Sequence, residues 1–209
     1  MLQEYKTVSQ AADDFFIEQR SRFIGYAKPV QTEAEAIAFI EEIRTKHWDA
    51  THNVYAYILR EGQIRRYSDD GEPHGTAGMP TLDVLQKSGV TDTAVVVTRY
   101  FGGVLLGAGG LVRAYSHGAK IALDAAKIIT MRMELLCTLQ CDYNQYGKLA
   151  ALIPAFNGII DNTDFADKVT LNFHIQEDDY NAFIKPLADT TCGSVVPKII
   201  DQRYFHRSI

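Results

Sequence analysis

Glycine is unevenly distributed along this chain, and the distribution limits the folds that the chain can adopt. Of the 15 glycines, 11 lie between Gly62 and Gly118, while the last third of the chain has only Gly147, Gly158 and Gly193. Glycine is used where a backbone must turn with positive φ or approach another backbone closely. The middle of the chain is therefore predicted to contain specialised loops, and the last third to consist of regular strands and helices.

Composition excludes several classes of protein. The 209 residues are 46% hydrophobic and 22% charged, which is typical of a folded globular chain and not of a disordered or fibrous one. The 21 Lys and Arg against 26 Asp and Glu give a net charge of −5, so the chain has no overall basic field, and a DNA partner is not expected. Any RNA-binding surface must be local.

Cysteine usage and the N-terminal residues indicate the compartment. The three cysteines, Cys137, Cys141 and Cys192, are too sparse for a disulfide framework, which fits a reducing environment. The N-terminal sequence MLQEYKTVSQAADDFF has acidic residues where a signal peptide has a basic start and an apolar run. No window approaches the roughly 18 apolar residues of a membrane span. The sequence therefore predicts a cytoplasmic protein that does not contact a membrane.

The first 130 residues are predicted to mix strands and helices. Thr32 and Glu35 form a capping box that begins a helix ending near His47, and Pro29 ends the strand before it. The apolar run TAVVVTRYF is typical of a central strand buried on both faces. The other expected elements are one or two strands within 15–29, a hairpin of 52–59 with 64–68, a helix over 79–88, the apolar strand over 93–101 and a long helix over 111–127.

The rest of the chain has the order βαββαβ, which is the ferredoxin-like arrangement. Cys137 and Cys141 are expected on one face of its first strand, as buried thiols. The sequence therefore predicts an α+β fold with two domains, residues 1–130 and 131–209. The expected elements are a strand over 134–142, a helix over 146–156, strands over 159–163 and 168–176, a helix around 180–187 and a strand over 194–205.

The segment YSDDGEPHGTAGMP, residues 67–80, is too rich in turn residues to be regular structure. One interpretation is a cation-binding or acid/base site formed by Asp69, Asp70, Glu72 and His74, with His52 as a partner of His74. The spacing fits neither a calcium loop nor a two-histidine zinc motif, and no metal or other cofactor is predicted. The alternative is a turn that leads the chain into the next helix.

The segment RYFGGVLLGAGGLVR, residues 99–113, joins a strand end, a glycine-rich loop and a helix start. Free N–H groups and the positive end of the helix dipole suit an anion there, with Arg99 and Arg113 as charged contacts. The segment is not a P-loop, because Ala108 replaces the lysine, and it is not a dinucleotide fingerprint, because Val112 replaces the third glycine. The alternative is close packing of the helix, with both arginines in ordinary ion pairs.

Three motifs together resemble a known family. They are SRF at 21–23, YSDDGEPHGTAGMP at 67–80 and VVVTRYFGGVLLGAGGLVRAY at 95–115. They resemble the bacterial YigZ branch of the IMPACT family, whose N-terminal domain would cover about residues 16–128. The resemblance implies a first domain similar to a small-subunit ribosomal protein with a left-handed βαβ unit and to domain IV of elongation factor G. It implies a second domain similar to domain V of that factor.

The resemblance also implies a role in translation and names no assured reaction. The first hypothesis is a non-enzymatic protein that binds RNA, the ribosome or a translation factor, with no catalytic residue. Its binding residues would be Arg22, Arg99, Tyr100, Gly102, Gly103, Gly107, Gly109, Gly110 and Arg113.

The second hypothesis is a metal- or acid/base-assisted hydrolase of a phosphorylated small molecule. It would use His52, Asp69, Asp70, Glu72 and His74. Convergence of the two rich loops in one concave pocket, with shifted pKa values, would favour the hydrolase. An exposed apolar patch would favour a third class, an adaptor that binds proteins.

Overall fold

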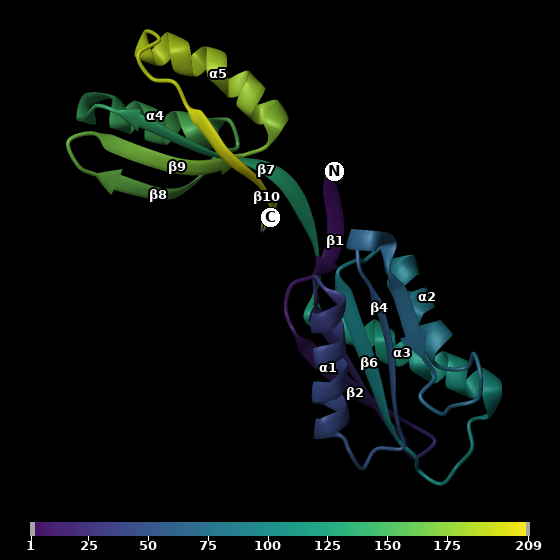
Figure 1. Cartoon of the computed structure of the whole chain (residues 1–209). Coiled ribbons are helices and arrows are strands. Elements are labelled where there is room, and N and C mark those ends of the chain that lie inside the picture. Colours follow the sequence, from purple (N-terminus) through teal and green to yellow (C-terminus); the bar gives the residue numbers. More distant parts are fainter. Residues whose placement is uncertain (1–2, 208–209) are drawn as a thin grey trace. The chain divides into compact units, whose positions relative to one another are not determined.

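The computed structural model describes residues 3–207, which form two units (Figure 1). One unit consists of residues 5–130, and the other consists of residues 131–207 with Gln3 and Glu4. The chain contains two five-stranded sheets and separate hydrophobic cores. The predicted α+β two-domain fold class is confirmed. Among the helices of residues 3–207, none combines the length and apolar character needed to cross a membrane.

The N-terminal unit is built on a sheet in which all neighbouring strands are antiparallel. The strand order is β2-β3-β6-β4-β5. Since β3 and β4 are both antiparallel to β6 between them, they run parallel to each other, and α1 joins them as a βαβ unit. The elements are β2 (Ala12–Glu18), β3 (Ser21–Pro29), α1 (Glu33–Lys46), β4 (His52–Ile58), a 3-10 turn (Glu61–Gln63), β5 (Arg65–Ser68), α2 (Gly78–Ser88), β6 (Thr93–Tyr100) and α3 (Gly107–Ala126).

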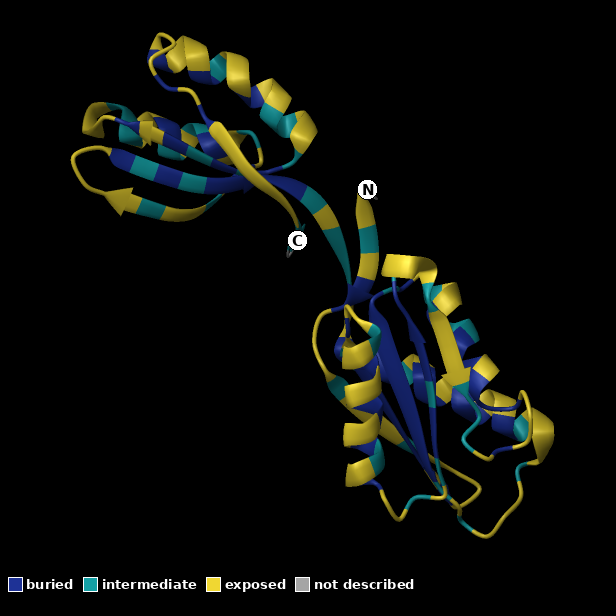
Figure 2. Cartoon of the chain, viewed as in Figure 1, coloured by how far each residue is buried: buried dark blue, intermediate teal, exposed yellow. Residues whose placement is uncertain are grey.

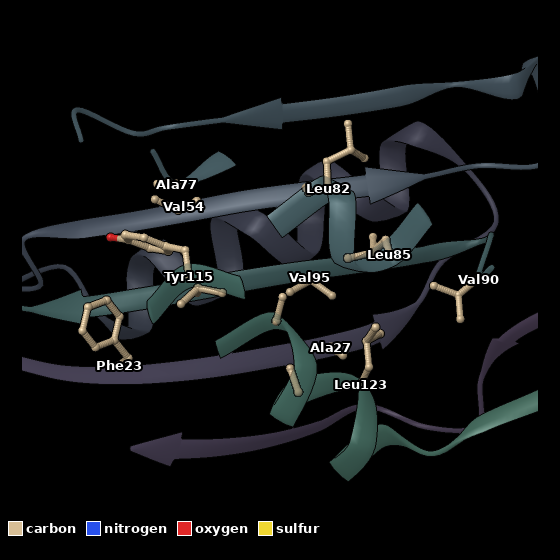
Figure 3. Close-up of a cluster of buried hydrophobic side chains, with 14 of the residues drawn as sticks. Phe23, Ala27, Val54, Ala77, Leu82, Leu85, Val90, Val95, Tyr115 and Leu123 are labelled. Atoms are coloured by element: carbon tan, nitrogen blue, oxygen red, sulfur yellow. The ribbon is translucent and has the colours of Figure 1, made fainter. Parts of the chain in front are cut away.

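Helices cover both faces of this sheet. Helix α1 packs on one face, and α2 and α3 pack on the other. Since successive residues of a strand point to opposite sides, alternate residues of the same strand contribute to the two cores. Ile24 and Val96 face α1, whereas Phe23 and Val95 face α3 and its buried Tyr115 (Figure 3). Strand β6 is buried from its first residue to its last but one, as its apolar run predicts, whereas the outer helix faces and the edge strands β2 and β5 are mostly exposed (Figure 2).

Helix α3 lies very close to β3 at one point. A Cβ atom on Gly25 would lie 2.1 Å from the carbonyl oxygen of Gly118, and a Cβ atom on Gly118 would lie 2.8 Å from Cγ1 of Val97. Neither glycine belongs to a loop. These two glycines therefore serve the packing of a helix on its sheet.

We expect Gly25→Ala to destabilise the protein, because the new methyl group would meet a backbone atom that cannot rotate away. Overpacking of this kind costs about 1–3 kcal/mol or more. Gly147→Ala is the matched control: it lies inside α4 (Tyr143–Ala155), and apart from its chain neighbours and the adjacent helix backbone no atom lies within 4 Å of the added Cβ. The control should stabilise the protein by about 0.5–1 kcal/mol. Urea unfolding measures both, and equal effects would contradict the close packing.

The C-terminal unit has the predicted order of elements. Its strands form the order β10-β7-β9-β8 with antiparallel neighbours, which is the ferredoxin-like arrangement. Its elements are β7 (Ile128–Cys141), α4 (Tyr143–Ala155), β8 (Ile159–Phe165), β9 (Val169–Ile175), α5 (Glu177–Thr191) and β10 (Lys198–His206).

The core of this unit lies between the sheet and its two helices. Alternate residues of β7 from Leu135 to Cys141 are buried against α4 and α5. Cys137 and Cys141 lie among them as free thiols, as predicted, and burial raises the pKa of Cys137 to about 11. Such a thiol carries little thiolate at neutral pH, so it acts as a small core residue.

Several element bounds differ from the prediction. Strand β7 begins at Ile128, six residues before the predicted start at 134. The sequence missed these first residues because they are exposed or half-buried and show no apolar alternation. Strand β10 begins at Lys198, later than 194, directly after Pro197, which has no N–H to donate. Strand β1 (Glu4–Val8) was not predicted, and it lies beside β7 in the C-terminal sheet.

Candidate functional site

Four loops of the N-terminal unit gather at one end of its sheet. Strands β3 and β4 begin there and β5 and β6 end there, because Arg22 pairs with Tyr100, His52 with Arg99 and Tyr55 with Ser68. We call this the loop end, and it comprises residues 19–20, 47–51, 69–77 and 101–106. It is the lower end of this unit in Figure 1. The acidic segment and the glycine-rich segment therefore meet, although they are far apart in sequence.

The first two carboxylates of the acidic segment hold the backbone. Asp69 accepts hydrogen bonds from the N–H groups of Gly75 (2.9 Å), Ala77 (3.1 Å) and Gly78 (2.8 Å) at the start of α2. Burial opposes ionisation of Asp69, but these three bonds outweigh it and hold its pKa below the usual value. Asp70 binds Arg44 of α1 (3.1 Å) and the Asn53 N–H (2.6 Å).

We expect Asp69→Ala to lower the free energy of unfolding at neutral pH by about 0.5–2 kcal/mol, the usual cost of losing a helix cap. The folded-state pKa is depressed, so this contribution is present above the unfolded-state pKa and is lost as pH falls through the folded-state value. The difference between wild type and variant should therefore shrink in acid. Urea unfolding over an acid pH series measures it.

Asp83→Ala is the control for that experiment. Asp83 also belongs to α2, and its carboxylate accepts no hydrogen bond within residues 3–207. A stability difference for Asp69→Ala that does not change with pH would contradict the capping role.

Glu72 takes part in a buried ion pair. Nη1 of Arg99 donates to its Oε1 (2.6 Å), and the Tyr115 hydroxyl donates to the same oxygen (2.7 Å). The Arg99 guanidinium lies 5.4 Å from the ring centres of both Phe23 and Phe101. The side chains of Glu72 and Arg99 are only 4% and 6% exposed. Burial and the neighbouring Glu72 carboxylate raise the pKa of Tyr115 far above its usual value, so this hydroxyl stays a donor.

Above this ion pair lies a pocket of about 380 Å³, which we call the loop-end pocket. Its walls come from both rich segments and from the loop before β4. The lining residues are Thr51, His52, Glu72, Pro73, Arg99, Phe101, Leu105, Leu106, Gly107, Ala108 and Leu111. The two segments thus converge in one concave site, as the hydrolase hypothesis requires.

The first turn of α3 forms one side of this pocket. No side chain caps it: the residue before it is Leu106, so Gly107 and Ala108 present backbone N–H groups at the rim. Gly103 (φ 81°) and Gly107 (φ 69°) have left-handed backbone conformations that favour glycine. Gly102 is needed for packing, because its Cβ would lie 2.1 Å from the Arg20 carbonyl oxygen. Gly109 and Gly110 complete the turn.

The structure separates the predicted binding residues. Arg99 and the glycine-rich loop lie on the α3 side of the sheet. Tyr100 follows Arg99 in β6 and pairs with Arg22 in β3, so both of these side chains lie on the opposite, α1 side. The Tyr100 hydroxyl donates to Asp49 (3.0 Å) and is bonded to His47 (2.8 Å). These residues therefore do not form the single surface that the first hypothesis groups together.

Of the predicted binding residues, Arg22 and Arg113 are the exposed cations. The guanidinium of Arg22 lies 4.9 Å from the centre of the Phe15 ring. Arg113 lies on α3 beside a second hollow of about 230 Å³, which Leu106 and Gly110 also line. Of the predicted acid/base residues, only His52 and Glu72 line the loop-end pocket, and His74 is 98% exposed.

The leucines in the walls of the pocket, Leu105, Leu106 and Leu111, were not predicted from sequence, whereas Phe101 stands beside Arg99 as an aromatic residue that could stack on a base. Leu105 is 84% exposed and Phe101 is 45% exposed. Trp48, on the loop that leads to Thr51, is 83% exposed. The signal was present in Val104-Leu105-Leu106, an apolar run inside a glycine-rich loop, of which Leu106 packs against the core while Val104 and Leu105 stay exposed.

The fold and site define a two-domain α+β protein with a pocket at the strand ends of its first domain. Residues 19–123 match the model of the Impact N-terminal domain, and residues 139–194 match a domain of unknown function named DUF1949. The chain belongs to the IMPACT family. The domain boundary that we propose near residue 130 lies between the two matched regions.

Similar proteins include bacterial members of this family. The chain is 36% identical to the IMPACT family member YvyE of Bacillus subtilis, over 100% of this chain and 97% of the relative. It is 40% identical to the IMPACT family member YigZ of Escherichia coli, over 85% and 88%. A crystal structure titled as a hypothetical protein is 34% identical with a TM-score of 0.61, covering 96% of this chain and 99% of that one.

We expect Arg99→Ala to destabilise the protein by about 3–5 kcal/mol, because it leaves the Glu72 carboxylate buried without its partner. Arg113→Ala is the matched control: this arginine is exposed, so its loss should change stability by about 0.5 kcal/mol or less. Thermal and urea unfolding compare the two variants. A cost for Arg99→Ala as small as that of the control would show that the buried pair does not hold the loop end together.

Proposed function

We propose that this protein is a non-enzymatic, translation-associated protein that binds RNA through its loop end. The observation that carries the proposal is the placement of uncapped α3 amides beside exposed Phe101 and Leu105. RNA presents the matching chemistry, since its phosphates accept hydrogen bonds and its unstacked bases pack on aromatic and apolar side chains. Membership in the IMPACT family, whose motifs fill these loops, supports the link to translation.

The contacts follow from the charges of the loop end. A phosphate would accept from the Gly107 and Ala108 amides, where the helix dipole favours an anion. Arg113, two turns further along α3, would bind the next phosphate, and a base would stack on Phe101. The net charge of −5 opposes RNA at long range, so the interaction depends on these local groups.

RNA is a better fit than a hydrolase substrate, although the two segments converge. The carboxylate oxygens of Asp69 and Asp70 already accept hydrogen bonds from backbone N–H groups and from Arg44. Glu72 is neutralised by Arg99. The remaining pocket walls are mostly apolar. A ribosome would present the same RNA chemistry, whereas a translation factor would use the exposed apolar side chains without the α3 amides.

The test is binding of a mixed-sequence single-stranded RNA over a potassium chloride series, followed by fluorescence anisotropy. Affinity should fall with salt, and Arg113→Ala should lower the log–log slope by about 0.7, the value of one phosphate contact on a single strand. Arg22→Ala is the control, because it removes an exposed arginine from the other side of the sheet.

Two results would contradict the proposal. One is an affinity that does not change with salt. The other is hydrolysis of a phosphorylated substrate that His52→Ala abolishes with the fold intact, which would favour the hydrolase. An equal loss for Arg22→Ala and Arg113→Ala would place RNA on both sides of the sheet.

A further inference from the structure

The floor of the loop-end pocket contains a histidine whose tautomer is determined by its hydrogen bond. Nδ1 of His52 lies 2.7 Å from the carbonyl oxygen of Asp70, and a carbonyl only accepts, so Nδ1 carries the proton. In the neutral ring, Nε2 is therefore an acceptor. It lies 3.8 Å from Oε1 of Glu72, which is also an acceptor and too distant for a hydrogen bond. The floor of the pocket thus brings two acceptors close together.

Glu72 adds a third acceptor position. Its Oε1 receives Arg99 and Tyr115, whereas its Oε2 receives no hydrogen bond within residues 3–207. Within those residues, Nε of Arg99 is the only side-chain nitrogen or oxygen that is both fully buried and without a hydrogen-bond partner. Oε2 of Glu72 has no partner either, so it is not fully buried and reaches open space. Glu72 is also one of the residues that line the loop-end pocket. The floor therefore offers acceptors that lack a donor.

The rest of the loop-end pocket limits the shape and charge of a ligand. Its walls are apolar and include Phe101, Leu106 and Leu111, which suit a flat ring. Arg99 already neutralises Glu72, and the α3 N-terminus at the rim is electropositive, so a cationic side chain gains little here. A neutral ring that donates N–H groups to the floor and carries an anion at the rim fits all three conditions.

We propose that the loop-end pocket binds one nucleobase with an exocyclic amino group, adenine, cytosine or guanine, with its phosphate on the α3 amides. The amino group would donate its two N–H groups to Nε2 of His52 and Oε2 of Glu72. Uracil has a carbonyl oxygen where cytosine has the amino group, so its acceptor would face acceptors. This inference rests on the proposed function when the base comes from RNA, and a free nucleotide has the same chemistry.

The test uses the full chain with labelled homopolymers of adenylate, cytidylate and uridylate of equal length, and with AMP, CMP and UMP. The adenylate and cytidylate strands should bind about tenfold more tightly than the uridylate strand, because a polar site rejects a base that leaves its groups unpaired. Ala108→Trp should remove this preference by filling the pocket from an exposed position. Ala151→Trp, at an exposed position of α4, is the matched control and should keep it.

A second variant tests the floor directly. Glu72→Gln replaces Oε2 by an amide that can donate, so the preference against uridylate should fall while the α3 amides remain. Circular dichroism and thermal unfolding establish whether this variant is folded, and Ala108→Trp answers the question if it is not.

The outcomes separate this inference from the proposed function. RNA binding that depends on salt, is equal for all three homopolymers and is unchanged in Ala108→Trp would overturn the base pocket and leave the proposed function standing. A preference for AMP and CMP over UMP that Ala108→Trp abolishes, without RNA binding, would support the pocket with a free nucleotide as its ligand. Binding of an arginine-rich peptide instead of any nucleotide would overturn the inference.

Discussion

The ion pair between Arg99 and Glu72 joins the three segments that form the loop end. Arg99 is on the central strand, Glu72 is in the acidic loop, and the Tyr115 hydroxyl brings in α3. Both charges are almost fully buried, so the pair pays a large desolvation penalty that only close geometry and extra hydrogen bonds offset. If one partner is missing, the other is left as an unpaired charge in the core. The position of the acidic loop therefore depends on an arginine that lies far away in sequence.

Glycines of the N-terminal unit have two different structural roles. Gly25, Gly102 and Gly118 lie where two backbones, or a backbone and a side chain, approach too closely for a Cβ atom. Gly103 and Gly107 have left-handed conformations with no atom close to the missing Cβ, so they shape an open loop. The packing role holds α3 against β3 and thereby fixes the start of α3. Gly103 and Gly107, which lack close neighbours, leave room beside the backbone amides at the start of α3.

The loop end places apolar and hydrogen-bonding groups side by side. Exposed Phe101 and Leu105 lie next to backbone donors, above a neutralised carboxylate and a histidine acceptor. This combination differs from a purely apolar docking patch, because each polar group has a defined direction. It also differs from a general polyanion surface, because the charges are few. Recognition of one base with its phosphate uses both kinds of group, which is why we favour it.

The sequence by itself determined the fold class and most of the elements, although it missed β1. The helix cap at Thr32, the apolar run of β6 and the βαββαβ order each depend on residues close together in the chain, and the motifs indicated the family. The capping box is only half formed, because the Glu35 side chain accepts from the Gln31 N–H and not from that of Thr32. Sequence could not determine which side chains meet, because that depends on strand pairing and on the alternation of strand faces. It grouped Arg99 with Arg22 and Tyr100, and the sheet placed them on opposite sides. Only the tertiary structure brought Glu72 to Arg99, since a buried charge selects its partner through the packing of elements far apart in sequence.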